Sequence, residues 1–110
     1  MGGSDLFTGT LDLLILGIIE HRPLHGYAIG KQIRDSSRGV LDLEEGALYP
    51  ALHRLRRRNL VVSEWRRTET GRRAKFYSIT PAGARRLADE HDRWRTFTDA
   101  VRAVLEKGTG

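Results

Sequence analysis

The stretch that decides the fold runs from Glu45 to Thr80 and reads EGALYPALHRLRRRNLVVSEWRRTETGRRAKFYSIT. Its first part repeats leucine every three or four positions, which predicts an amphipathic helix over residues 45–58. The periodicity then changes, and two runs rich in β-branched and aromatic residues, at 61–65 and 76–79, lie on either side of the turn signal at 70–71. The stretch therefore predicts a helix that is followed by a β-hairpin.

The same stretch carries most of the positive charge. Residues 53–75 contain nine lysines and arginines against two glutamates, a net charge of +7, while the whole chain carries +5. The rest of the chain is therefore at −2, which is 5 minus 7. A basic block on a nearly neutral chain is typical of a protein that binds a polyanion. A solvated cationic face is the alternative interpretation of these charges.

Outward from this stretch, apolar periodicity predicts three more helices. They cover residues 10–20 and 27–36 before it and 81–107 after it, and Pro23 and Gly26 mark the turn between the first two. Three helices followed by a basic hairpin is the order of a winged helix-turn-helix. The predicted fold class is α+β and mainly helical, a winged helix-turn-helix with a long C-terminal dimerisation helix.

The predicted organisation of the chain has four parts. We expect a flexible N-terminus over 1–9 and a winged-helix DNA-binding domain over 10–80. A C-terminal dimerisation helix over 81–107 and a flexible tail over 108–110 complete the chain.

Composition narrows the classes of function. The 110 residues fit one small domain, and the absence of cysteine excludes disulfides and cysteine-bearing zinc sites. The longest apolar run, residues 13–19, is far shorter than the roughly 20 residues needed to cross a bilayer. No signal-like segment opens the chain. We expect a cytoplasmic protein with no membrane partner, no cofactor and no metal.

The polar face of the helix over 45–58 predicts contact with double-stranded DNA. At about 100° per residue, its leucines share one side and the polar residues lie on the other. A helix fits the major groove, and arginines on a hairpin tip reach phosphates or a minor groove. Pro50 is interpreted as a first-turn proline, with a kink as the alternative. The candidate DNA-binding residues are Tyr27, Lys31, Tyr49, Pro50, His53, Arg54, Arg57, Arg72, Arg73 and Lys75.

The first and last helices predict a homodimer. The helix over 10–20 is apolar around nearly its whole circumference, so it must be buried on more than one side. The helix over 81–107 carries an apolar seam and outruns a small domain. The alternative is that this seam only covers the chain's own core. The candidate interface residues are Leu11, Leu14, Ile18, Leu87, His91, Trp94, Phe97, Val101 and Leu105.

Other classes of function find less support. The sequence has no Gly-rich phosphate loop and no nucleophile elbow, and Pro23 separates His21 from His25. The acidic residues at 89–92 are interpreted as a solvated face among arginines. We therefore expect no catalytic and no metal-binding residues. A winged-helix protein–protein adaptor that never touches nucleic acid is the alternative function.

The chain resembles the PadR family of transcriptional regulators over about residues 10–85. Three motifs carry the resemblance: His25-Gly26-Tyr27, Gly46-Ala47-Leu48-Tyr49-Pro50-Ala51-Leu52-His53-Arg54-Leu55 and Tyr77-Ser78-Ile79-Thr80-Pro81-Ala82-Gly83. The resemblance implies a homodimer, pseudo-palindromic operators and usually repression, with the C-terminal helix packed against the first helix of the partner. Many members have a longer, multi-helix C-terminal region, so the single helix here resembles the short type.

Trp94, at the middle of the last predicted helix, is a candidate ligand-binding residue. A two-fold axis near it brings two indoles together, and such a pair holds a flat aromatic molecule by stacking. Because some members of the resembled family respond to aromatic compounds, the resemblance implies a small aromatic effector. The alternative is that Trp94 only packs as a large residue at the interface.

Overall fold

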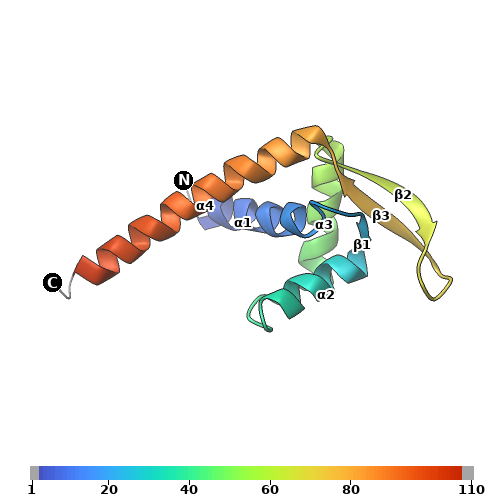
Figure 1. The fold of residues 1–110 in the computed structure, drawn as a ribbon, viewed down its shortest axis with the longest axis horizontal. Coiled ribbons are helices and arrows are strands. Elements are labelled where there is room, and N and C mark those ends of the chain that lie inside the picture. The colour runs from blue at the N-terminus through green and yellow to red at the C-terminus, as the bar shows by residue number, and fades with distance from the viewer. Residues whose placement is uncertain (1–2, 108–110) are drawn as a thin grey trace.

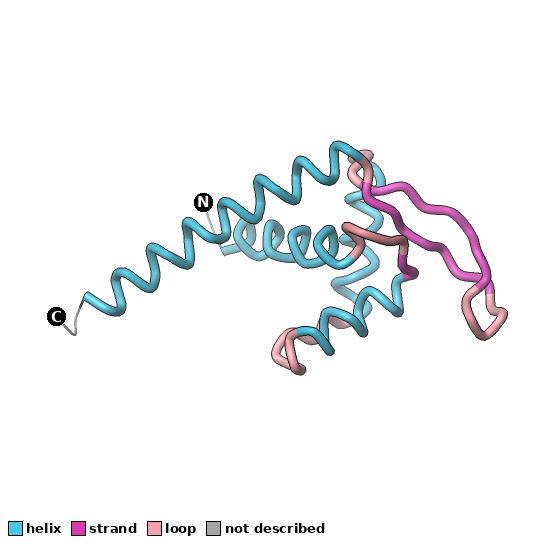
Figure 2. The backbone as a smooth tube through the Cα atoms, in the orientation of Figure 1, coloured by secondary structure: helices cyan, strands magenta, loops and turns pink. Residues whose placement is uncertain are grey.

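The computed structural model describes residues 3–107 and the side chains from Gly9 onward (Figures 1 and 2). Its elements are α1 (Gly3–Ile18), β1 (Leu24–His25), α2 (Gly26–Ser36), α3 (Glu45–Arg57), β2 (Val61–Arg67), β3 (Arg73–Ile79) and α4 (Pro81–Lys107). The three strands form one antiparallel sheet in the order β1-β3-β2. The predicted α+β winged helix-turn-helix with a long last helix is confirmed.

α1 begins at Gly3, inside the segment expected to be flexible. A glycine in a helix costs about 1 kcal/mol relative to alanine, which tertiary packing readily offsets. Here α1 lies along α4, so the helix has a partner over much of its length (Figure 1). Met1, Gly2 and the predicted tail over 108–110 lie outside the described residues.

β1 was not predicted, because the segment over 21–26 was interpreted as a turn. Leu24 pairs with Tyr77 and His25 pairs with Phe76. A two-residue strand is too short to leave a periodic pattern, and it exists because β3 lies alongside. The pairing ties the turn before α2 to the base of the hairpin.

The core lies where α1, α2 and α3 meet the base of the sheet. Ile15, Leu16 and Ile29 are completely or almost completely inaccessible, as are Leu52 and Leu55 on the inner face of α3. The hairpin projects from one side of this body, and the C-terminal half of α4 extends beyond it on the other (Figure 1). The molecule therefore measures 58 × 28 × 24 Å.

Local signals set the ends of α3 and α4. After α3, Asn59 has a positive φ of 61°, and the Leu60 N–H donates to the Leu55 carbonyl at 3.0 Å. This is the left-handed helix ending that asparagine tolerates. At the start of α4, the Thr80 hydroxyl accepts from the Gly83 N–H at 3.0 Å, as predicted for an N-cap that precedes a proline.

Candidate nucleic-acid interface

The outer face of α3 is polar and open. Leu48, Leu52 and Leu55 point into the core, while the side chains of the opposite face are exposed. The exposed candidates on this helix are Tyr49, Pro50, His53 and Arg57. The predicted division of the helix into a core side and a solvent side is therefore seen, and its contact with DNA stays a prediction.

Pro50 does not lie in the first turn of α3. The helix begins at Glu45, so Pro50 is inside it, and the first-turn interpretation is wrong. Proline has no N–H to give to the carbonyl four residues earlier, which is that of Gly46. Because Gly46 is exposed, water can supply the missing bond.

Arg54 turns away from the outer face. Its side chain is only 27% exposed, and its Nη2 donates to the carboxylate of Asp12, which is fully buried in α1. The expectation that Arg54 faces DNA is therefore corrected. On a helical wheel Arg54 lies at the border between the two faces, and only the position of Asp12 decides which way it turns.

The start of α2 packs directly against α3. A Cβ added to Gly26 would lie 2.6 Å from Cε1 of Tyr49, so only glycine leaves room for that ring. His25 caps α2, because its Nδ1 accepts from the Ala28 N–H at 3.3 Å. The neighbouring Tyr27 is exposed and stacks on His25 with 6.4 Å between ring centroids. Tyr27 and Tyr49 are thus both held at the junction between the two helices.

Lys31, one turn further along α2, is exposed as well. Its Nζ lies 2.8 Å from Oδ2 of Asp35. This contact lowers the pKa of Asp35, mainly through the hydrogen bond from Lys31. The ion pair is open to solvent, where such pairs are worth little, so it does not withhold Lys31 from a phosphate.

The register of the hairpin separates its cations onto two faces. Trp65 is paired with Lys75, and Arg67 with Arg73, so these four side chains share one face of the β2–β3 ribbon. Arg66 belongs to the other face, where its guanidinium carbon lies 5.6 Å from the Phe76 ring centroid. The tip between the strands holds the exposed Arg72.

Two cationic side chains, those of Arg73 and Lys75, lie over the ring of Trp65. The guanidinium carbon of Arg73 lies 5.1 Å from the ring centroid and Nζ of Lys75 lies 5.5 Å from it. Both distances are within the range of a cation–π contact. The indole therefore holds two of the predicted DNA-binding residues in place. From the sequence, Trp65 is predicted only as the last residue of the strand over 61–65, because strand periodicity carries no signal of a cation–π contact.

The Trp65 face continues toward α3 at the base of the hairpin. Tyr77 lies on this face, two register positions from Lys75, and its side chain is buried. Burial raises the pKa of Tyr77, the neighbouring Tyr49 raises it further, and Arg56 lowers it. Tyr49 and Arg56 belong to α3, so the base of the hairpin at Tyr77 lies close to this helix.

The candidate interface residues fall into two groups. Leu11 and Leu87 are buried in the chain's own core, so the expectation that they face a partner is corrected. Leu14 and Ile18 are half-buried against the same core. The first half of α4 covers its own α1, as the alternative interpretation held. The exposed group lies further along α4 and consists of His91, Trp94, Phe97, Val101 and Leu105.

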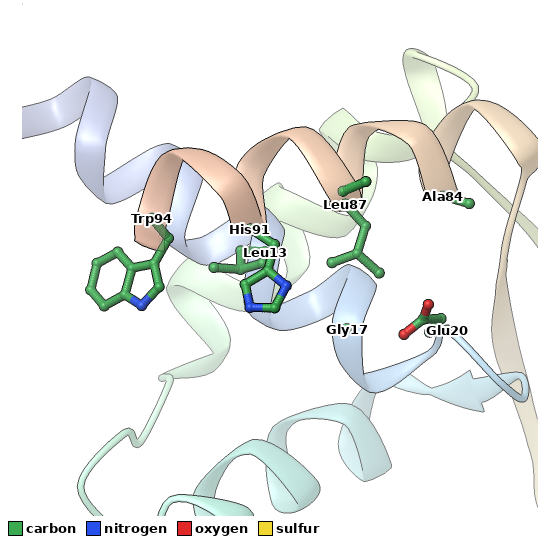
Figure 3. Close-up of a pocket in the computed structure, with 8 residues that line it drawn as sticks. Leu13, Gly17, Glu20, Ala84, Leu87, His91 and Trp94 are labelled. Carbon is green, nitrogen blue, oxygen red and sulfur yellow. The ribbon is translucent and has the colours of Figure 1, made fainter. Parts of the chain in front are cut away.

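An open pocket of about 500 Å³ lies between α1 and α4. Figure 3 shows Trp94, His91 and Leu87 from α4 above Gly17 from α1 and Glu20, which follows the end of that helix. Trp94 is 37% exposed, and its ring centroid lies 6.2 Å from that of Phe97.

A compact helical body with a basic wing and a polar third helix defines the winged-helix class of proteins. Comparison with known proteins places the chain within that class. The sequence model of the transcriptional regulator PadR-like family matches residues 15–89, so the chain belongs to this family. The family consists of transcriptional regulators rather than enzymes, which confirms the expected class of function.

Individual relatives agree with the family. The chain is 34% identical over 93 residues to the transcriptional regulator Rv3488 of Mycobacterium tuberculosis, covering 82% of this chain and 80% of the relative. It is 33% identical to a PadR family transcription regulator of Clostridium difficile, with a TM-score of 0.75 and coverage of 86% and 97%. A transcriptional regulator from Clostridium thermocellum gives 28% identity, a TM-score of 0.79 and coverage of 89% and 95%. Within residues 3–107, no helix is both long and apolar enough to span a membrane.

Proposed function

We propose that this regulator is a homodimer that represses transcription by binding a pseudo-palindromic operator in double-stranded DNA. The observation that carries the proposal is the exposed polar face of α3 together with the cations held on the Trp65 face of the wing. A regulator of this kind works in the compartment that holds the DNA, so we place it in the cytoplasm.

Each part of that surface has a role in the proposed complex. α3 enters the major groove, where His53 and Arg57 meet base edges and Tyr49 and Pro50 lie beside them. Tyr27 and Lys31 on α2 contact the flanking phosphates. On the wing, Arg72, Arg73 and Lys75 contact phosphates or the minor groove.

The exposed stripe on α4 supports a second copy of this chain as the partner. Phe97 is 44% exposed and Leu105 is 71% exposed, with Val101 and Val104 between them. An uncovered apolar stripe on a helix that extends beyond the body is typical of an interface. Two-fold pairing along it would present two copies of α3 to half-sites about one helical turn, or a multiple of it, apart.

The wing should contribute through charge alone. Changing Arg72 and Arg73 to alanine should weaken binding to every DNA sequence, because phosphates are common to all of them. A dimer that engages on the order of 6–10 phosphates should lose affinity with a log–log salt slope of about −5 to −9, and the variant should flatten this slope. Mobility shifts over a series of salt concentrations measure both effects.

The other face of the hairpin provides the control. Arg66→Ala removes a cation from the face that Phe76 occupies, and it should change the slope less than the Arg72/Arg73 pair does. An identical slope in the Arg72/Arg73 variant and the unmodified protein would remove the wing from the interface. A protein that binds no DNA at physiological salt would instead support the protein–protein adaptor.

The pocket beside Trp94 supports a second proposal, a small aromatic effector. In the proposed dimer two such pockets approach each other, and planar aromatic compounds at micromolar concentration should quench Trp94 fluorescence by stacking. Trp94→Phe should abolish the quenching and leave the dimer intact. Because Trp65 lies on the wing, it should report little, and Trp65→Phe is the matched control. Quenching that survives in Trp94→Phe would end the effector proposal.

A further inference from the structure

Asp12 is a charged residue in the middle of the apolar core. It lies on α1 between Leu11 and Leu13, and its side chain has no exposure to solvent. A carboxylate is costly to bury unless cations and hydrogen bonds compensate it. The groups that compensate Asp12 belong to other helices. They have no role in the apolar packing of the core or in the proposed contact with DNA.

Asp12 joins three helices through one carboxylate. Its Oδ1 accepts from Nη2 of Arg54 on α3, and its Oδ2 accepts from Nη2 of Arg86 on α4 at 3.1 Å. Arg86 also donates through Nε to Oε1 of Glu90 at 3.1 Å. Two carboxylates and two guanidinium groups thus form a series of ion pairs from α3 through α1 to α4, and Nη1 of Arg93 lies a further 3.8 Å from Oε1 of Glu90.

At the α4 end of this series of ion pairs, Glu90 is packed as tightly as Asp12 is at its centre. Glu90 is buried, with 7% exposure, although it lies among charged residues on the sequence. A Cβ added to Gly9 of α1 would lie 2.7 Å from Oε2 of Glu90, so the two helices approach closely at this level. A displacement of α4 therefore moves Glu90 and Arg86 against α1.

The α3 end is next to the residues proposed to read DNA. Arg54 directly follows His53 and precedes Arg57 by three positions. The apolar face of α3 holds the helix in the core without fixing its rotation sharply, because hydrophobic packing is non-directional. A charge-assisted hydrogen bond has a preferred direction and length. The bond from Arg54 to Asp12 therefore restricts rotation of α3 about its own axis.

From this geometry we propose that Asp12 is a positioning residue for α3, which sets the rotation of α3 relative to α4. The inference rests on the proposed function, since it is the DNA-facing side of α3 that is positioned. In the proposed dimer α4 carries the contact with the partner. Asp12 then couples the arrangement of the two chains to the orientation of His53 and Arg57 in each.

Asp12→Asn tests this role with almost no change in shape. An amide has one oxygen that accepts, and its NH2 group is turned toward a guanidinium that also donates, so one of the two arms must break. We expect the affinity for a duplex selected from a randomised library by the unmodified protein to fall about tenfold more than the affinity for random DNA, the order of one lost base contact. Random DNA is bound mainly through phosphates, which are less sensitive to the rotation of α3.

Two further variants separate positioning from stability. Arg86→Met removes both bonds of the α4 arm, to Asp12 and to Glu90, at a side chain that is 28% exposed, and it should lower the same selectivity ratio. Ile19→Ala leaves a cavity directly after the end of α1, where Ile19 is buried, and keeps all the ion pairs that connect Arg54, Asp12, Arg86 and Glu90. It should lower the melting temperature and leave the ratio unchanged.

The outcomes distinguish this inference from the proposed function. If Asp12→Asn and Arg86→Met lower the melting temperature but keep the ratio of the unmodified protein, Asp12 is structural only and the inference is overturned, while operator binding stands. If Ile19→Ala lowers the ratio equally, selectivity follows stability and the inference is again overturned. If the unmodified protein selects no sequence from the library, the proposed operator binding fails first and the positioning role fails with it.

Discussion

Gly83→Ala should unfold the protein at a markedly lower temperature. A Cβ at this position would lie 2.1 Å from the carbonyl oxygen of Leu60 and 2.8 Å from Cγ1 of Ile79. The Leu60 carbonyl cannot move freely, because it accepts from the Thr80 N–H at 3.1 Å. Alanine gains about 1 kcal/mol of helix propensity over glycine. Overpacking typically costs about 1–3 kcal/mol and occasionally more, and this clash is with a bonded backbone carbonyl, so the clash decides the sign.

The expected net loss in the free energy of unfolding is about 2 kcal/mol or more, a fall in melting temperature of about 10 °C. Thermal denaturation followed by circular dichroism at one fixed protein concentration measures it. Gly30→Ala is the matched control, because a Cβ there meets only Cδ2 of Leu48 at an ordinary 3.5 Å. Gly30→Ala should leave stability unchanged or raise it. A Gly83→Ala variant as stable as the unmodified protein would mean that the contact between α4 and the end of α3 is looser than described.

Phe97→Asp combined with Val101→Asp should convert the protein to monomers. Both residues belong to the exposed stripe of α4, and two carboxylates buried in a dimer interface would lie unpaired. Operator affinity should then fall by about 100-fold or more, because the second half-site no longer binds as an intramolecular event. Light scattering gives the mass, and mobility shifts give the affinity.

A control with the same charge change separates interface from electrostatics. Thr96→Asp combined with Ala103→Asp also adds two carboxylates to α4, at exposed positions on the side away from the stripe. This variant should stay dimeric and lose little affinity for the operator. Monomeric unmodified protein at micromolar concentration would overturn the dimer, and equal dissociation of both variants would show that the stripe is not the contact.

Periodicity was sufficient to predict the architecture. The leucines at 48, 52 and 55 give the inner face of α3, and the change to alternating residues after Leu60 gives the hairpin. Thr80 and Pro81 locate the start of α4. These features are local, since each depends on neighbours within one or two turns of the chain.

What sequence could not predict depends on contacts between distant segments. β1 forms only because β3 lies beside it. Arg54 turns inward only because Asp12, 42 residues earlier in the sequence, accepts a hydrogen bond from it. A helical wheel cannot show that Leu11 and Leu87 are covered by their own chain. One signal was available for the buried chain of ion pairs: Asp12 is the single charged residue in an apolar run from Leu11 to Ile19. A lone charge in such a run requires a partner from elsewhere in the fold.

Because α4 extends beyond the body, the concentration of the protein should affect whether the end of this helix is folded. Past Glu90 the helix has no buried residue, and an isolated segment of this length is marginally helical in water. In the proposed dimer its order would depend on the second chain, so that folding of this end and assembly would become one equilibrium. Dilution would fray the end of α4 and loosen the pair together. A cell with few copies would hold a form unable to span two half-sites, and synthesis of the protein would itself set the threshold for silencing its targets.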